Sequence, residues 1–336
     1  MKPIAAMMIA LTLVALAGCG GDSPPPASGE RPRIALIYKA TTNPFFQAME
    51  EGARKKAAEL GVDLEVAGIE SETDADRQAD LVRNMLGRRV QALIIAPASS
   101  VGIVTPLLRA QAAKVPIINI DNRIDPREAD KQGLRVATFI GPNNFEGAKK
   151  AGLCACELIK QKLKAGQAGK VLIIRGIDGV ENAEARRAGF EAAAKEAGLD
   201  IAGSQSGNWQ TEDAQKVTAA MLAANPDVRG ILCANDKMAL GAIAAVKARG
   251  RIGEIVIVGY DNIDLAREAM ARGEMQATVE QNPALMGALG VQCALAALKG
   301  ETLPGVTPVP VQLIAAAADT GAKGGGSKAP PKLGGG

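Results

Sequence analysis

The feature that most constrains the fold is a regular alternation, from Arg33 onward, of short β-rich segments with longer segments of helical periodicity. This alternation is typical of parallel strands joined by right-handed crossovers, with a helix in each connection. The segment 44–60 illustrates the helical part, because its apolar residues fall three or four apart and form one face. These residues are Phe46, Met49, Ala53, Ala57 and Leu60.

The segments with strand-like composition divide into two groups. The predicted strands are 33–39, 63–67, 92–96, 116–121, 135–140, 170–176, 200–206, 230–234, 255–260 and 276–280. The unit of strand plus helix occurs about four times before Arg123 and about four times after Arg135. We therefore predict an α/β protein with two doubly wound parallel-sheet lobes instead of one continuous sheet.

The two ends of the chain differ from this pattern. An apolar run from Ile4 to Ala17 follows Lys2 and is shorter than the roughly 20 residues that a membrane-spanning helix needs, as in a secretory signal peptide. Residues 16–19 (Leu-Ala-Gly-Cys) resemble the lipobox of bacterial lipoproteins, which implies lipidation of Cys19. We expect a signal peptide in 1–18, a Pro/Gly-rich tether in 19–32, anchoring at the periplasmic or cell-surface side of a membrane, and a disordered tail in 318–336.

Composition excludes several function classes. Histidine is absent, which rules out Ser-His-Asp or Cys-His catalysis and His-ligated zinc. The formal net charge is only +3, so nothing favours a nucleic-acid partner. Neither a phosphate-binding glycine loop nor a D-x-D-x-D-G calcium loop occurs. We expect no nucleic acid, no cofactor, no metal and no catalytic residue.

Four cysteines follow Cys19 in the chain, and their surroundings predict buried thiols. Cys154 and Cys156 are two apart in a helical segment, where their side chains point to different faces. Cys233 lies in a predicted buried strand and Cys293 in an Ala/Leu-rich helix. The export signal permits disulfides, so a pairing of Cys233 or Cys293 stays open.

Aromatic and polar side chains collect where the predicted strands end. The chain has only 5 Phe, 2 Tyr and 1 Trp, so their convergence on one edge is informative. Ligands of doubly wound sheets bind outside the carboxyl ends of the strands. The candidates at these ends are Lys39, Asn43, Phe45, Phe46, Asp121, Asn122, Trp209, Asn235, Asp261 and Gln281.

Rings, carboxylates and amides in one place are typical of sugar recognition. A sugar presents apolar C–H faces that stack on rings and hydroxyls that both donate and accept hydrogen bonds. Each candidate also has a purely structural interpretation. Phe46 fits a helix core, Asp121 and Asp261 fit turns or helix caps, and Asn235 fits the cap of the helix that follows it.

These residues resemble the type I periplasmic sugar-binding proteins, and the match extends over nearly all of 33–314. It rests on Asn43-Pro44-Phe45-Phe46, Ile120-Asp121, the segment 234–241, Val258-Gly259-Tyr260-Asp261 and the segment 277–283. The resemblance implies that Asn43, Phe45, Phe46, Asp121, Trp209, Asn235, Asp261 and Gln281 line a cleft between two lobes. It also implies hinge crossings near Pro142, Gln281 and Val309, with lobes formed by 33–142 plus 282–308 and by 143–281 plus 309–317.

The chain departs from the ribose-binding members of that family at three positions. Asn122 stands where those members have an arginine, Glu184 aligns with their second ligand-binding arginine, and Lys39 aligns with a small serine. Lys39 and Glu184 either pair across the cleft, contact different substituents of the ligand, or leave one of the two in solvent. We expect a neutral sugar or polyol of about four to six carbons, other than ribose.

The resemblance implies a monomeric binding protein that closes around its ligand and delivers it to the permease of an ABC-type importer. A sensor that presents the bound sugar to a chemoreceptor or histidine kinase is the main alternative. A sugar-responsive transcription factor shares the fold but needs a helix-turn-helix where this chain has its signal peptide. A glycosidase using Asp121 and Asp261 is a further alternative. For the cleft aromatic Trp209 we expect that substitution by Ala weakens ligand binding and leaves the fold intact.

Overall fold

The computed structural model describes residues 31–164, 167 and 169–316. The predicted signal peptide, Cys19, the tether up to residue 30 and the tail 318–336 lie outside the described residues. Within the described part, no helix combines the length and the apolar character that crossing a membrane requires.

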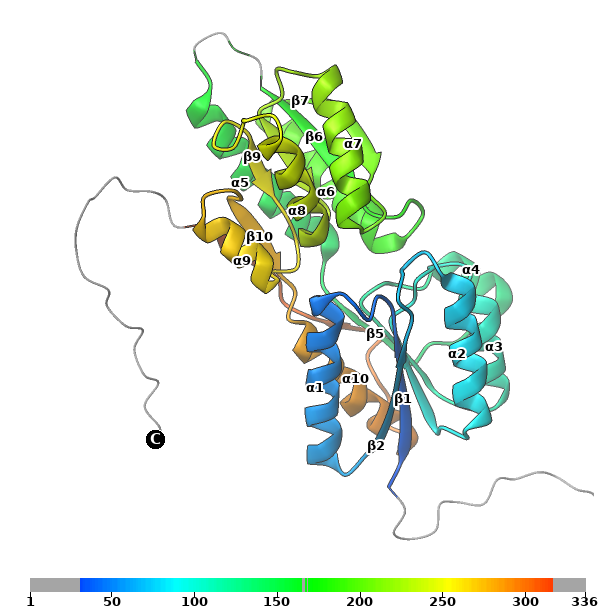
Figure 1. Ribbon diagram of the computed structural model, residues 1–336. Coiled ribbons are helices and arrows are strands. Elements are labelled where there is room, and N and C mark those ends of the chain that lie inside the picture. Colours follow the sequence, from blue (N-terminus) through cyan, green and yellow to red (C-terminus); the bar gives the residue numbers. More distant parts are fainter. Residues whose placement is uncertain (1–30, 165–166, 168, 317–336) are drawn as a thin grey trace, which may run out of the picture. The chain divides into compact units, whose positions relative to one another are not determined.

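The described residues form two six-stranded sheets, each of which is the centre of one lobe (Figure 1). The strand order is β11-β5-β4-β3-β1-β2 in the first lobe and β12-β10-β9-β8-β6-β7 in the second. All strand pairs are parallel except that of β12 with β10. This arrangement confirms the predicted fold class of two doubly wound α/β lobes.

Both lobes repeat the strand-helix unit that the sequence predicts. The first lobe contains β1 (Arg33–Tyr38), α1 (Pro44–Leu60), β2 (Asp63–Gly68), α2 (Ala75–Gly87), β3 (Ala92–Ile95), α3 (Val104–Ala112), β4 (Ile117–Ile120), α4 (Pro126–Gln132), β5 (Thr138–Gly141), α10 (Pro283–Leu298) and β11 (Val306–Pro308). The second contains α5 (Asn144–Lys162), β6 (Lys170–Arg175), α6 (Glu181–Ala197), β7 (Asp200–Ser206), α7 (Thr211–Ala224), β8 (Gly230–Cys233), α8 (Asp236–Lys247), β9 (Val256–Val258), α9 (Asp264–Ala271), β10 (Ala277–Glu280) and β12 (Gln312–Ala315).

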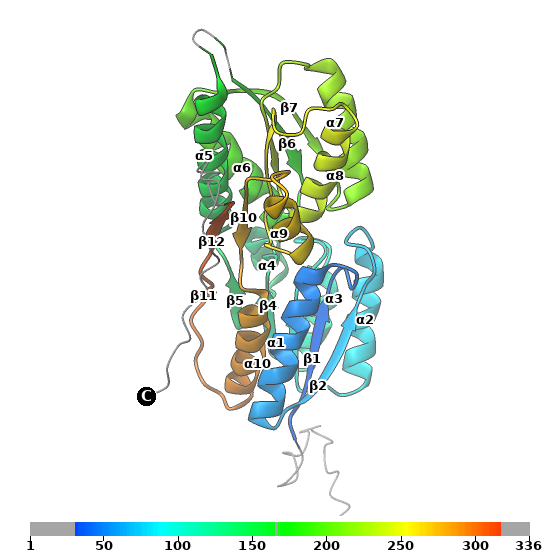
Figure 2. The ribbon, with the colours of Figure 1, turned by 60° about the vertical axis from the view of Figure 1, so that its left-hand side comes forward.

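The chain passes between the two sheets three times. The connections are residues 142–143 between β5 and α5, 281–282 between β10 and α10, and 309–311 between β11 and β12. Figure 2 shows these connections beside one another where the lobes meet. They contain Pro142, Gln281 and Val309, the residues near which the family resemblance places the hinge.

Helices cover both faces of each sheet, because alternate residues of the strands point to opposite sides. In β1, Ile34 and Leu36 pack toward α1 and α10, whereas Ala35 and Ile37 pack toward α2 and α3. In the second lobe α5 pairs with α6 and α7 with α8, on opposite sides of the strands (Figures 1 and 2). All these strand residues are fully buried, which explains their nearly continuous apolar runs.

Some details differ from the predicted elements. Helix α1 has the predicted bounds, but its last residue, Leu60, is 40% exposed and lies off the buried face. Strands β11 and β12 were not predicted, because both are short, partly exposed edge strands without a buried apolar run. The four cysteines of the described part are free; Cys156, Cys233 and Cys293 are buried, and Cys154 is half-buried.

Candidate ligand-binding site

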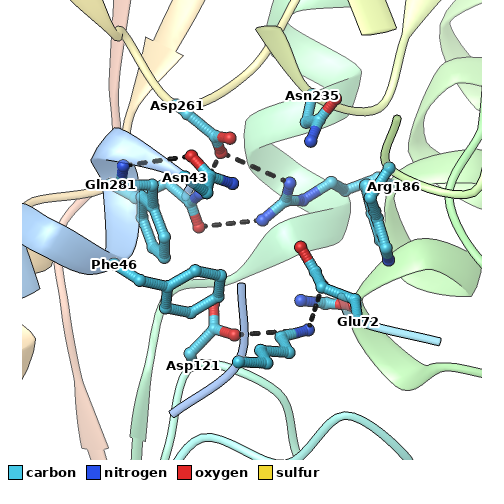
Figure 3. Close-up of a pocket in the computed structure, with 12 residues that line it drawn as sticks. Asn43, Phe46, Glu72, Asp121, Arg186, Asn235, Asp261 and Gln281 are labelled. Carbon is cyan, nitrogen blue, oxygen red and sulfur yellow. Dashed lines mark hydrogen bonds and ion pairs between the residues drawn. The ribbon is translucent and has the colours of Figure 1, made fainter. Parts of the chain in front are cut away.

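The carboxyl ends of strands from both sheets converge on one pocket (Figure 3). The first lobe contributes Lys39, Asn43, Phe45, Phe46, Glu72 and Asp121. The second lobe contributes Asn182, Arg186, Trp209, Asn235 and Asp261, and Gln281 comes from a connection between the lobes. All of the residues predicted from the sequence line this pocket, apart from Asn122 and Glu184.

A buried lysine and two carboxylates form the first-lobe side of the pocket. Lys39 Nζ lies 2.9 Å from Glu72 Oε2 and 3.7 Å from Asp121 Oδ2. Burial acts to lower the pKa of Lys39, but the two carboxylates outweigh it and raise the pKa above its usual value. The lysine is therefore a cation in a nearly dry site, held by charge pairing.

Arg186 organises the second-lobe side. Its guanidinium donates to Asn144 Oδ1 at 2.8 Å, to the Ala234 carbonyl at 2.8 Å and to Gln281 Oε1 at 2.9 Å. Its carbon Cζ lies 3.8 Å from the centre of the Tyr260 ring, so the planar group also stacks on an aromatic face. Arg186 is only 3% exposed and joins α5, β8 and the connection at Gln281 into one network.

Two aspartates face each other across the pocket, Asp121 from the first lobe and Asp261 from the second (Figure 3). Asp261 Oδ1 accepts from Gln281 Nε2 at 2.6 Å and lies 3.6 Å from Arg186 Nη1. Burial raises the pKa of Asp121 and of Asp261, although Lys39 and Arg186 oppose the rise for Asp121 and Arg186 opposes it for Asp261. Both carboxylates would gain from further hydrogen-bond donors, such as hydroxyl groups.

Backbone strain accompanies three of the lining residues. Asp121, Trp209 and Asp261 have φ angles of 62°, 61° and 123°. Non-glycine residues in this region carry a cost of about 1–3 kcal/mol each, so the surrounding structure must hold them there. Such residues cluster at functional sites, which agrees with their position at strand ends.

Aromatic rings from both lobes approach the pocket. Phe45 and Phe46 form an edge-to-face pair with ring centres 5.0 Å apart. Lys39 Nζ lies 5.8 Å from the centre of the Phe46 ring and 6.0 Å from that of Trp209. A flat apolar ligand face can therefore meet rings of both lobes beside charged groups, the combination that sugars require.

Two asparagines act as helix caps and line the pocket at the same time. Asn43 Oδ1 accepts from the Phe45 N–H at the start of α1, and Asn235 Oδ1 accepts from the Met238 N–H at the start of α8. Asn235 is therefore a helix cap, as its structural interpretation predicts, and it also lines the pocket. Because the carbonyl oxygens are used by the caps, each side chain offers its NH₂ group to the pocket.

Several buried polar atoms of the lining residues have no hydrogen-bond partner within the described residues. They are Asp121 Oδ2, Asn182 Oδ1 and Trp209 Nε1. The first two are acceptors and the third is a donor. An unsatisfied buried polar group is unfavourable, so these atoms indicate a ligand with both donors and acceptors.

Glu184 lies outside the pocket lining. Its carboxylate accepts from the Gly179 N–H at 3.0 Å and from Arg187 Nε at 2.9 Å, and it makes no ion pair with Lys39. Residues two apart on a helix are rotated by about 200°, so when Arg186 points into the pocket Glu184 points away from it. Glu184 therefore does not reach this pocket, and the arginine of α6 that does is Arg186.

Asn122 also lies outside the pocket lining, although it is fully buried. Its Nδ2 donates to the Pro97 carbonyl at 3.0 Å and to Ser100 Oγ at 3.2 Å. Asp121 and Asn122 are adjacent, and their side chains leave the backbone in different directions. Only Asp121 faces the pocket.

Three lining residues were missed, and each has a recognisable signal. Glu72 follows the end of β2, a strand end at which no candidate was named. Asn182 and Arg186 are four apart on α6 and thus share a helix face that begins just after β6. Polar residues on the helix that follows a strand end are a signal for these positions, although Glu181, Glu184 and Arg187 share that character.

Trp209 differs from its expected role in one respect. It is 3% exposed and belongs to the second lobe's hydrophobic core, where it packs against the backbone of Gly176. A Cβ at Gly176 would lie 2.1 Å from Trp209 Cζ2, so this glycine makes room for the ring. Trp209 therefore belongs to the core as well as to the pocket lining, so we expect its substitution by Ala to lower stability in addition to ligand affinity.

Comparison with known proteins places this site in context. The model of the periplasmic binding protein domain family matches residues 34–302. A D-ribose/D-allose-binding protein of Pseudomonas aeruginosa is 39% identical over 326 residues, covering 94% of this chain and 100% of the relative. A D-allose-binding periplasmic protein of Escherichia coli is 36% identical over 273 residues, covering 80% of this chain and 86% of the relative.

Solved structures are similar over the same range. The crystal structure of an ABC transporter periplasmic solute-binding protein from Actinobacillus succinogenes, with bound D-allose, superposes with a TM-score of 0.78 at 34% identity. The superposition covers 87% of this chain and 100% of the other. The fold of the described residues thus has a counterpart in an experimentally determined structure.

Proposed function

Since the chain belongs to the periplasmic binding protein domain family, we propose that it captures a neutral aldose in the pocket between its lobes and delivers it to an ABC-type importer. D-Allose is the first candidate ligand. D-Ribose, which the departures at Lys39, Asn122 and Glu184 disfavoured in the sequence, is the second candidate because one relative is named for both sugars. Relatives named for these sugars, at 39% and 36% identity, support this choice, as does a similar structure that contains D-allose. The paired charges of the pocket favour a neutral ligand over an ionised one.

The observation that carries the proposal is a set of buried pocket atoms without a hydrogen-bond partner among the described residues. They are Asn182 Oδ1, Trp209 Nε1 and Asp121 Oδ2, the last of which has only the ion pair with Lys39 at 3.7 Å. A sugar hydroxyl donates one hydrogen bond and accepts others, so a ring of hydroxyls can satisfy all three. A hydrogen bond to a charged group such as Asp121 contributes about 1.5–3 kcal/mol, and one to a neutral group such as Asn182 or Trp209 about 0.5–1.5 kcal/mol. A few such bonds, with ring stacking, are sufficient for micromolar or tighter binding.

The proposed mechanism is hinge closure. The lobes would be 33–142 plus 282–308 and 143–281 plus 309–317, and they would move about the three connections near Pro142, Gln281 and Val309. Only the closed form brings residues of both lobes against the same ligand, so ligand binding shifts the equilibrium toward closure. We propose that the chain acts as a monomer, performs no chemistry and needs no cofactor.

Calorimetric titration tests this proposal. The chain without residues 1–18 and with Cys19→Ala is stripped of ligand by unfolding and refolding. It is then titrated with D-allose, D-ribose, other pentoses and hexoses, and polyols. We expect tight one-to-one binding of D-allose and a rise in melting temperature. A ligand at 100 times its dissociation constant stabilises the folded protein by about 2.7 kcal/mol. Absence of binding to every compound would refute the sugar assignment.

Two variants make the test specific to this pocket. Glu72→Ala removes the partner of Lys39 and should weaken binding at least tenfold, or about 1.4 kcal/mol. Glu184→Ala is the matched control, because this glutamate lies outside the pocket lining, and it should bind like the wild type. Equal losses in both variants would place the ligand elsewhere.

We further propose that the chain is exported and anchored through lipidated Cys19. The support is the sequence of residues 1–19, which lie outside the described residues. In a host with lipoprotein processing, the wild type should incorporate labelled palmitate and fractionate with membranes. Cys19→Ala should lose both properties, and palmitate labelling that persists in this variant would contradict the assignment.

A further inference from the structure

Helix α6 begins without a cap from its own lobe. Its N-cap residue, Val180, has the extended backbone conformation that is usual at this position, with φ −86° and ψ 127°, but makes no side-chain cap hydrogen bond. The first N–H groups of a helix have no partner within the helix, and Ser, Thr, Asn or Asp normally supplies one. The start of α6 therefore needs acceptors from elsewhere.

Those acceptors come from the first lobe. The Glu181 N–H donates to Ser100 Oγ at 3.1 Å, and the Asn182 N–H donates to Asn122 Oδ1 at 3.4 Å. Ser100 follows β3 and Asn122 follows β4, whereas Glu181 and Asn182 begin a helix of the second lobe. A helix cap is thus formed across the cleft, with the serine making the shorter contact.

The two capping residues are held in place within their own lobe. Asn122 Nδ2 donates to the Pro97 carbonyl and to Ser100 Oγ, and the Asn122 carbonyl accepts from Asn119 Nδ2 at 2.8 Å. Ser100 is 3% exposed and Asn122 is fully buried. Both acceptors are therefore already oriented, and capping requires little further loss of side-chain freedom.

The helix that receives this cap carries ligand-site residues. Asn182 and Arg186 line the pocket from the first two turns of α6, whereas Ser100 and Asn122 do not line it. Docking of the α6 N-terminus on the first lobe therefore brings Asn182 and Arg186 into the pocket. When the lobes separate, the cap hydrogen bonds must break.

We propose that Ser100 and Asn122 are positioning residues that cap α6 across the cleft, stabilise the closed arrangement of the lobes and thereby raise ligand affinity without touching the ligand. The statement about affinity rests on the proposed sugar-binding function, whereas the statement about closure does not. Removing a helix cap changes an equilibrium by about twofold to thirtyfold. Because the closed form holds the ligand, loss of the cap should raise the dissociation constant of the ligand by the same factor.

Ser100→Ala is the primary variant, since it removes the shorter contact with little change in volume. Ser99→Ala is its matched control, because among the described residues the hydrogen-bond partner of Ser99 Oγ is the Gly102 N–H of the same lobe. Hydrogen exchange of the Glu181 amide is measured by NMR without sugar and, if the wild type binds one, at saturation. We expect faster exchange in Ser100→Ala by about twofold to thirtyfold, and wild-type exchange in Ser99→Ala. The amide of Ile173 in β6 should keep its rate in both variants and so exclude general destabilisation.

Calorimetry and stopped-flow dissociation with D-allose form the second arm. Ser100→Ala should raise the dissociation constant by the same factor, mainly through faster release. Val180→Thr supplies a hydroxyl at the helix's own N-cap position, so Ser100→Ala should cost less affinity in that background. A structural role confined to the first lobe would not produce this dependence on Val180.

The outcomes separate the two proposals. If the wild type binds no sugar, the proposed function fails and the exchange of the Glu181 amide alone decides the cap. Equal Glu181 exchange in wild type and Ser100→Ala, together with an unchanged dissociation constant wherever sugar binds, overturns the cap. If the Glu181 amide exchanges faster in Ser100→Ala but not in Ser99→Ala, the result supports the cap across the cleft.

Discussion

The buried pair of Lys39 and Glu72 gives the sharpest test of the pocket's electrostatics. Lys39→Met keeps much of the side-chain volume but leaves two carboxylates, Glu72 and Asp121, without their cation. Removing one partner of a buried ion pair costs about 3–5 kcal/mol, so the free energy of unfolding should fall by that amount. The pKa of Lys39 lies above its usual 10.5, so the stabilisation is complete at neutral pH and is lost only as alkaline pH passes that raised value.

A double-mutant cycle isolates the pair. Glu72→Gln should cost about 1.5–3 kcal/mol, and Lys39→Met/Glu72→Gln should cost less than the sum of the single variants by a similar amount. Urea unfolding of ligand-free protein at pH 7 is followed by far-UV circular dichroism. The fluorescence of Trp209, the only tryptophan, reports on the second lobe separately. The losses should appear in the first-lobe transition.

The prediction is refuted if the stability losses of Lys39→Met and Glu72→Gln simply add in the double variant. A coupling energy within about 0.5 kcal/mol of zero would mean that Lys39 and Glu72 do not interact in solution, and the account of the pocket would be wrong. The matched control is the exposed pair Lys56 and Glu59 on α1, treated with the same substitutions. Solvent screening should leave that pair without measurable coupling.

Three further predictions follow from single contacts. Gly176→Ala should displace the Trp209 ring, shift its fluorescence and weaken sugar binding at least tenfold, or about 1.4 kcal/mol. Gly87→Ala is the control, because the added Cβ would lie in open space, and it should bind sugar like the wild type. Equal sugar affinities of the two variants would contradict this packing. Arg186→Lys should weaken binding at least tenfold, about 1.4 kcal/mol by calorimetry, because an ammonium cannot make the three hydrogen bonds and the stacking contact of the guanidinium. Burial raises the pKa of Asp236 from 3.8 to about 6. The folded chain therefore binds this proton more tightly than the unfolded chain does, and the free energy of unfolding falls as pH rises from about 3.8 to about 6. Asp236→Asn should remove this slope from the curve of melting temperature against pH, and an unchanged slope would assign it to other groups.

The sequence was sufficient for the elements with strong local patterns. The bounds of α1 follow from its apolar periodicity and from Asn43 and Pro44 at its start, and they agree with the structure. The central strands are continuous apolar runs, because they are covered on both faces. Strands β11 and β12 lack such runs, since an edge strand is defined mainly by the neighbour it pairs with.

The candidate site was predictable where a residue's position relative to a strand end was enough. This applies to Asp121, Asn235 and Asp261, which lie one to three residues after the end of a buried strand. It failed for Glu184, where the rotation of α6 about its axis decides which side chain faces the pocket. That rotation depends on the packing of α6 against α5, and the pattern of α6 itself does not encode it.

The sequence by itself determined the class of fold, the order of the central strands and their helices, and most of the side chains at the strand ends, because these follow from interactions between neighbouring residues. Only the tertiary structure decided which of those side chains meet. Glu72 reaches Lys39 because β2 pairs with β1, and Ser100 caps Glu181 because two lobes approach each other. Contacts of this kind join segments that are distant in the chain, so the packing of whole lobes determines them.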